Sequence, residues 1–251
     1  MIEKPGAFLV PPLLYALNVV LHRGVVRGFF YVLVAPVMLL ASLLAFSRGA
    51  WINLAVALAV YAGLTLYTLA RHRDRVRLAL YVLLSLLLCA VLLAVALTVP
   101  TIADLLWERA SFDQSYDVGR EGRFGGQAKA LGIVLTHPLG IGALEFARVY
   151  HHEDAHQVYL SMFLNGGWVG GTAYLALVGI TIYLALRHVA GDRGGNGISA
   201  VLAASFLGVA LEGIVVDTDH WRHFFLIMAL IWGVALAPKN GPPSQTQGYG
   251  S

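Results

Sequence analysis

The sequence predicts an all-α membrane protein, a polytopic bundle of about seven transmembrane helices with one large loop outside the cytoplasm. Hydrophobic residues make up 58% of the chain and charged residues only 12%, against about 25% charged in a soluble domain. Several uncharged runs are also long enough to cross a bilayer core of about 30 Å as helices. The single cysteine, Cys89, lies in an apolar run, which excludes a disulfide framework and a cysteine metal site.

Each long apolar run predicts a helix, because lipid cannot satisfy exposed backbone groups. The run from 157 to 186 is long for one straight span, and its Asn165-Gly166-Gly167 predicts a break or close packing against a neighbour. Pro11 and Pro12 are expected to distort the first span. The predicted spans are Ala7–Leu21, Phe29–Ser47, Trp51–Ala70, Leu78–Val99, Gln157–Leu186, Ile198–Val216 and Phe224–Ala237.

The charges predict the orientation of the spans. Alternate loops are basic, and the positive-inside rule places them in the cytoplasm. That side carries nine Lys and Arg residues but only two acids, whereas the opposite side carries eleven of the fourteen acids. We therefore expect residues 1–238 to form a membrane domain, residues 100–156 to form the large loop that carries the active site, and residues 239–251 to form a disordered cytoplasmic tail. Seven spans then place the first residue outside, which suggests that upstream helices are missing.

A dense group of ionisable residues lies at the end of the large loop, where Arg148 to Leu160 reads RVYHHEDAHQVYL. Two other polar segments, around Arg48 and around His220, open on the same side. A guanidinium binds phosphate through two parallel hydrogen bonds, and a histidine can accept a proton from a hydroxyl near neutral pH. These groups suit the transfer of a sugar from a lipid pyrophosphate to an alcohol.

Ordered motifs in residues 45 to 190 resemble the O-antigen ligase and polymerase superfamily. The chain resembles this family at Phe46-Ser-Arg-Gly-Ala50, at the loop helix that follows Arg120 and Arg123, at Thr136-His-Pro-Leu-Gly-Ile-Gly142 and at Ala155-His156-Gln-Val-Tyr-Leu160. The resemblance implies a C-type membrane glycosyltransferase in the bacterial inner membrane with its active site on the periplasmic face. It also implies that this chain is the C-terminal portion of a protein of about twelve helices.

The resemblance further implies a reaction. Such enzymes transfer a glycan from undecaprenyl pyrophosphate to an acceptor hydroxyl with inversion, without a metal or other cofactor. A ligase uses a lipid A core sugar as acceptor, and a polymerase uses the growing glycan. The implied partners are these two glycan substrates and the lipid bilayer, and no nucleic acid.

Residue roles follow from the same resemblance. His156 is the expected base, and Arg48 with Arg120 or Arg123 is expected to bind the pyrophosphate. Gln157 and Glu212 are candidate supporting residues. The chain departs from the family pattern in two places: Gln157 replaces the usual asparagine after the histidine, and Asn165 stands where an acid is frequent.

Several alternatives start from the same residues. The cluster from His151 to His156, completed by His220 or His223, would suit a metal-dependent membrane protein, although its spacing fits no established zinc pattern. A polymerase of the same superfamily and an inactive truncated remnant are further alternatives. The Pro138 region is expected to form a tight turn, and the loop from Asp217 to His223 is expected to be a solvated rim.

Overall fold

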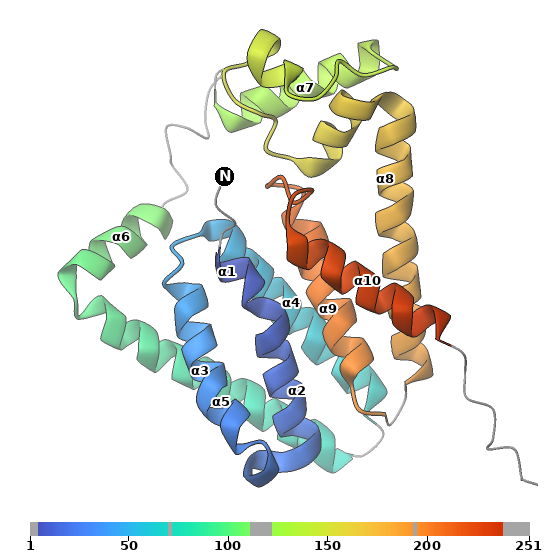
Figure 1. Cartoon of the computed structure of the whole chain (residues 1–251). Coiled ribbons are helices and arrows are strands. Elements are labelled where there is room, and N and C mark those ends of the chain that lie inside the picture. Colours follow the sequence, from blue (N-terminus) through green and yellow to red (C-terminus); the bar gives the residue numbers. More distant parts are fainter. Residues whose placement is uncertain (1–4, 70–71, 111–121, 193–194, 238–251) are drawn as a thin grey trace, which may run out of the picture.

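The computed structural model describes residues 5–69, 72–110, 122–192 and 195–237. All the regular elements among these residues are helices, arranged as an elongated bundle with a smaller helical unit above one end (Figure 1). The predicted tail at 239–251 and Arg120 lie outside the described residues. The elements are α1 (Pro5–Phe8), α2 (Val10–Arg27), α3 (Phe29–Leu43), α4 (Arg48–Thr68), α5 (His72–Leu97), α6 (Pro100–Ala110), α7 (Arg123–Thr136), the π-helix η1 (Phe146–Tyr150), α8 (Val158–Gly191), α9 (Ile198–Glu212) and α10 (Arg222–Leu236).

The seven predicted spans correspond to seven apolar helices in the described part of the chain. Four of them are long enough to cross a membrane, namely Gly6–Arg27, Arg48–Thr68, Asp74–Leu97 and Val158–Gly191. The other three, α3, α9 and α10, are shorter. The chain is therefore an all-α, multi-pass membrane protein. The first span extends beyond the predicted end at Leu21 to Arg27, but its helix is broken at Gly24, which has φ 78° and ψ 166°. The two prolines lie in the first turn of α2, where a missing N–H group costs no helical hydrogen bond, so they do not interrupt this helix.

The three basic connections meet at one end of the bundle, drawn lowest in Figure 1. Leu21, Leu69 and Leu78 form one small buried cluster there, which joins α2, the end of α4 and the start of α5. Asn18 on α2 donates a hydrogen bond of 2.8 Å to the carbonyl of Asn196, between α8 and α9. The described parts of these connections therefore share one end of the bundle, and the assignment of that end to the cytoplasm stays a prediction.

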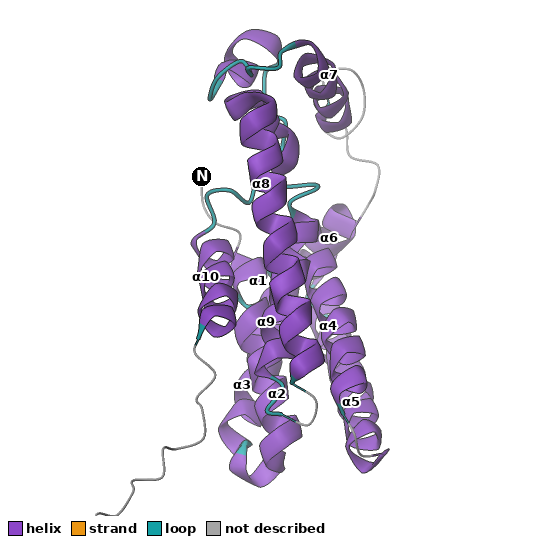
Figure 2. Ribbon diagram, turned by 90° about the vertical axis from the view of Figure 1, so that its right-hand side faces the viewer, coloured by secondary structure: helices purple, strands orange, loops and turns teal. Residues whose placement is uncertain are grey.

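The acidic side gathers at the opposite end. Gly49, at the start of α4, lies against Glu212 at the end of α9. The carbonyl of Gly213 accepts a hydrogen bond of 3.0 Å from the backbone N–H of Val158, the first residue of α8. The segments that begin at Arg48, Val158 and Gly213 are thus neighbours, and α7 lies above them (Figures 1 and 2).

The long helix α8 is broken where the sequence predicts. Gly167 has φ 65° and ψ −165°, a backbone conformation outside the helix. The break divides α8 into a short first segment and a long second segment that runs the height of the bundle (Figure 2). The first segment of α8 packs against α7 and so holds the preceding polar segment near that helix.

Candidate functional site

The turn at residues 137–142 fixes the broken helix to α7. The backbone N–H of Ile141 donates to the carbonyl of Leu164 at 2.7 Å, and that of Trp168 donates to the carbonyl of Pro138 at 2.8 Å. These bonds satisfy backbone groups that the break in α8 would leave without partners. Gly140 and Gly167 have positive φ and touch each other, so the predicted tight turn is present and acts as a clamp.

His156 lies at the end of the polar segment that leads from η1 into α8. Its φ of 48° is in the left-handed region, which is uncommon for a residue with a side chain. Its Nδ1 lies 3.6 Å from Oδ2 of Asp217, and its Nε2 lies 3.4 Å from Oε2 of Glu153. The imidazole therefore has one carboxylate near each ring nitrogen.

The environment of His156 favours its protonated form. Asp217, as a hydrogen-bonding neighbour and then as a negative charge, raises the pKa of His156 above its ordinary value. Burial and the positive charge of Arg123 oppose this shift, while Glu153 adds to it. An imidazole with a raised pKa is a stronger base than a free histidine, although a larger fraction of it is protonated at neutral pH.

Asp217 is the functional candidate that sequence reasoning missed. Its side chain is only 16% exposed, and Ser161 donates a hydrogen bond of 2.9 Å to its other oxygen, Oδ1. The prediction of a solvated rim is wrong for this residue, because the loop between α9 and α10 folds back over the start of α8. It is also wrong for His223, which is buried among the rings of Phe8 and Trp221.

Arg123 is the predicted arginine that the structure brings to His156. It is the first residue of α7, and its Nη2 donates to the carbonyl of His156 at 3.5 Å. The N-terminal end of a helix also carries a partial positive charge, which adds to that of the guanidinium. A second bond between Lys129 on α7 and the carbonyl of Tyr150 holds this helix against η1. Together these features place a cationic group beside the imidazole.

Arg48 and Glu212 lie at the same end of the bundle. Arg48 is half-buried at the start of α4, next to Gly49, which touches the carboxylate of Glu212. Glu212 is 2% exposed and accepts a hydrogen bond of 2.8 Å from Nδ2 of Asn53. The start of α4 stabilises this carboxylate through the helix dipole. Glu212 thereby links α4 to the backbone that supports the start of α8.

Gln157, the second predicted supporting residue, directly precedes α8. Its Oε1 is buried and has no hydrogen-bond partner within the described residues, and the same holds for Nε2 of Gln127 on α7. Buried polar atoms of this kind are rare in folded proteins. Each of these two side chains follows a site residue, because Gln157 is next to His156 and Gln127 is one helical turn after Arg123.

The alternative metal site receives no support from the geometry. No group of three or more His, Cys, Asp or Glu side chains is placed to hold a metal ion in the part of the chain that the structure describes. The ring of His151 instead stacks on that of Phe146, and its Nδ1 lies within hydrogen-bond distance of the backbone N–H and carbonyl of Glu153. The cluster instead forms pairs, since the rings of His151 and His152 lie 4.4 Å apart and His156 lies beside Glu153.

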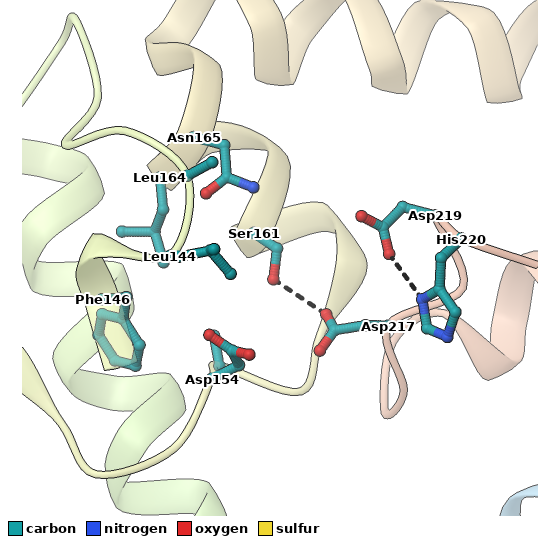
Figure 3. Close-up of a pocket in the computed structure, with 11 residues that line it drawn as sticks. Leu144, Phe146, Asp154, Ser161, Leu164, Asn165, Asp217, Asp219 and His220 are labelled. Carbon is teal, nitrogen blue, oxygen red and sulfur yellow. Dashed lines mark hydrogen bonds and ion pairs between the residues drawn. The ribbon is translucent and has the colours of Figure 1, made fainter. Parts of the chain in front are cut away.

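A pocket of about 280 Å³ opens beside Asp217 (Figure 3). Ser161 and Asn165, one turn apart on the first segment of α8, line one side of it. Asp154 lines another side, and Asp217 faces it from the α9–α10 loop (Figure 3). Asp217 therefore contacts both the pocket and His156.

Comparison with known proteins gives one family. Residues 33–175 match the family model described as O-Antigen ligase. This match covers more than half of the 251 residues and includes Arg48, Arg123 and His156. No curated protein and no solved structure gives a significant match to the chain.

Proposed function

The chain belongs to the O-antigen ligase family, and from this premise we propose that it transfers a glycan from undecaprenyl pyrophosphate to the hydroxyl of an acceptor, a lipid A core sugar. The site would lie on the periplasmic face of the bacterial inner membrane. Residues 1–238 would form the membrane domain, and the loop from 100 to 156 would carry much of the active site. The meeting of His156, Asp217 and Arg123 at one end of the bundle supports this proposal most directly.

His156 is the proposed base. With a proton on Nδ1 directed at Asp217, the lone pair of Nε2 is available to accept the proton of the acceptor hydroxyl. The oxygen of that hydroxyl then forms a bond to the anomeric carbon, and the bond from this carbon to the pyrophosphate breaks. Undecaprenyl pyrophosphate leaves with the electron pair, and a single displacement of this kind inverts the anomeric configuration. Glu153, near Nε2, would stabilise the imidazolium that forms.

The guanidinium groups are proposed to bind the leaving group. Arg123 lies beside His156, and Arg48 lies at the same end of the bundle. A fixed guanidinium neutralises the charge that develops on the pyrophosphate as the bond breaks. In this mechanism arginine does the work that a divalent cation does in many phosphate-binding enzymes, so we propose that the reaction needs no metal.

Transfer in proteoliposomes tests this function. Protein reconstituted with an undecaprenyl-pyrophosphate-linked glycan and an acceptor glycolipid should release undecaprenyl pyrophosphate in the presence of EDTA. Loss of a general base commonly lowers turnover by a factor of about 10² or more, so His156→Ala should lose most activity. His188→Ala is the matched control, since His188 lies at the other end of α8. Equal turnover in His156→Ala and the unaltered protein would refute the assignment of the base.

A further inference from the structure

We infer that the pocket beside Asp217 binds a sugar of the acceptor, and that it selects a neutral or amino sugar over an acidic one. This inference rests on the proposed function. The pocket, of about 280 Å³, is slightly smaller than the usual range of about 300–1,000 Å³ for small-molecule sites. Its size therefore suits a single sugar ring rather than a long oligosaccharide.

The hydrogen-bonding groups in the pocket match the hydroxyls of a sugar. The half-buried carboxylate of Asp154 and the side-chain amide of Asn165 have no hydrogen-bond partner in the protein within the described residues. A carboxylate accepts hydrogen bonds, and an amide both donates and accepts them. Each polyol hydroxyl likewise donates and accepts, so a sugar can satisfy both groups. Leu144 and Phe146 add an apolar side to the pocket (Figure 3), which suits the apolar face of a sugar ring.

The negative charge of the pocket is the reason that we expect it to prefer a neutral or amino sugar over an acidic one. Asp154, Asp217 and Asp219 all line it, whereas no Lys or Arg is among its described lining residues. His220 is the basic residue that lines it, and its Nδ1 lies 3.3 Å from a carboxylate oxygen of Asp219. A carboxylate or phosphate on the bound sugar would lie among these negative charges, which disfavours its binding. A neutral sugar avoids this repulsion, and an ammonium group would be attracted.

The position of the pocket identifies the acceptor rather than the donor. Asp217 faces the pocket through Oδ1, which Ser161 binds, and faces His156 through Oδ2. A sugar held there would contact the carboxylate that also faces Nδ1 of the proposed base, and the described lining, which has no Lys or Arg, does not suit the pyrophosphate of the donor. The guanidinium of Arg123, which is proposed to hold the pyrophosphate of the donor, contacts His156 through the backbone carbonyl instead.

Three probes with the same ring test the inference. The methyl glycosides of glucose, glucosamine and glucuronic acid differ in charge but share most of their hydroxyls. Their binding to the full chain in detergent can be compared by saturation-transfer NMR, with and without saturating undecaprenyl-pyrophosphate-linked glycan. We expect the glucuronide to bind about tenfold more weakly than the other two. Asp154→Asn should reduce the difference in affinity between the glucuronide and the other two probes. Asp74 is an acid at the other end of the bundle, so Asp74→Asn should leave that difference unchanged.

The outcomes separate the inference from the proposed function. Equal binding of all three probes, or no binding of any, would overturn the inference even if the protein transfers glycans. Displacement of the probes by the donor glycan would assign the pocket to the donor and so also overturn it. Charge-selective binding that the donor leaves intact, in a protein that shows no transfer, would retain the inference and refute the proposed function.

Discussion

The carboxylate of Asp217 lies 3.6 Å from the imidazole of His156, although the loop and the helix start that carry them are far apart in the sequence. The same carboxylate accepts a hydrogen bond from Ser161, which fixes its position relative to α8. A histidine that functions as a base needs a fixed tautomer and orientation, and a neighbouring carboxylate provides both. Asp217 is thus a positioning residue for the proposed reaction.

Removal of the charge on Asp217 should shift the pH dependence of transfer. Asp217 stabilises the imidazolium and raises the pKa of His156, so Asp217→Asn should lower that pKa. The neutral base then persists to lower pH, and the acidic limb of the kcat profile should move to lower pH. The maximal rate should also fall, but by less than the factor of about 10² expected for His156→Ala.

A pH profile of turnover in proteoliposomes checks this prediction. Asp104→Asn is the control, because Asp104 is an exposed acid on α6. An acidic limb that stays in place in Asp217→Asn would mean that Asp217 does not influence the ionisation of the catalytic group.

The sequence predicts the parts of the site that depend on local patterns. Long uncharged runs locate the spans, alternating basic loops assign the ends of the bundle, and Asn165-Gly166-Gly167 predicts the break in α8. The order of motifs points to His156 and to Arg120 or Arg123, and the structure brings Arg123 into contact with His156. Each of these signals is contained in a short stretch of chain.

The missed residues depend on contacts between distant segments. Asp217 is one of several polar residues in a short loop, and nothing in its spacing distinguishes it from Asp219. Its role follows from the hydrogen bond with Ser161, which only the packing of the α9–α10 loop on α8 creates. In the same way, the hydrogen bond between Asn53 and Glu212 joins α4 to α9. Neither helical periodicity nor charge counting contains such information.

Arg123→Lys should impair transfer although it keeps the charge. The guanidinium combines a contact with the carbonyl of His156 with a planar fork that suits a pyrophosphate. An ammonium cannot reproduce that geometry, so turnover should fall by about tenfold or more, and by about 10² or more in Arg123→Ala. Arg148→Lys is the control, because Arg148 is 74% exposed and pairs with Glu145. If turnover in Arg123→Lys equals that of the unaltered protein, Arg123 contributes only its positive charge and the planar geometry of its guanidinium is not needed.

Gly49→Ala should destabilise the end of the bundle that carries the site. A Cβ at this position would lie 2.8 Å from Oε1 of Glu212, so the buried carboxylate would have to move away from the start of α4. Leaving a buried hydrogen-bonding group without its partner costs about 1–3 kcal/mol, so the melting temperature in detergent should fall if the bond from Asn53 to Glu212 is lost. Gly63→Ala on the same helix meets no atom within 4 Å and should be neutral or slightly stabilising. The intrinsic tryptophan fluorescence, to which Trp51 on α4 contributes, can report both transitions. Equal melting temperatures for the two variants would show that the contact between position 49 and Glu212 contributes little to the stability of the protein.

Gly167→Ala should separate the loop unit from the bundle. Gly167 has φ 65°, and an added Cβ would lie 2.5 Å from the carbonyl oxygen of Pro138. The turn at 137–142 would have to move, and the bond from Trp168 to Pro138, 2.8 Å long, would be lost. Strain at such a position costs about 1–3 kcal/mol, in addition to that of the lost contacts. Because the same turn holds α7, the guanidinium of Arg123 should move away from His156 and transfer should fall.

Gly166→Ala is the matched control for this change. Gly166 is the preceding residue, and a Cβ there meets no atom within 4 Å. Limited proteolysis of the segment from 122 to 157, measured beside transfer activity, distinguishes the two variants. We expect faster cleavage and lower turnover in Gly167→Ala only. If both variants resist the protease equally, the turn does not clamp α8. The position of Arg123 would then depend on the contacts of α7 with η1, such as the bond from Lys129 to Tyr150.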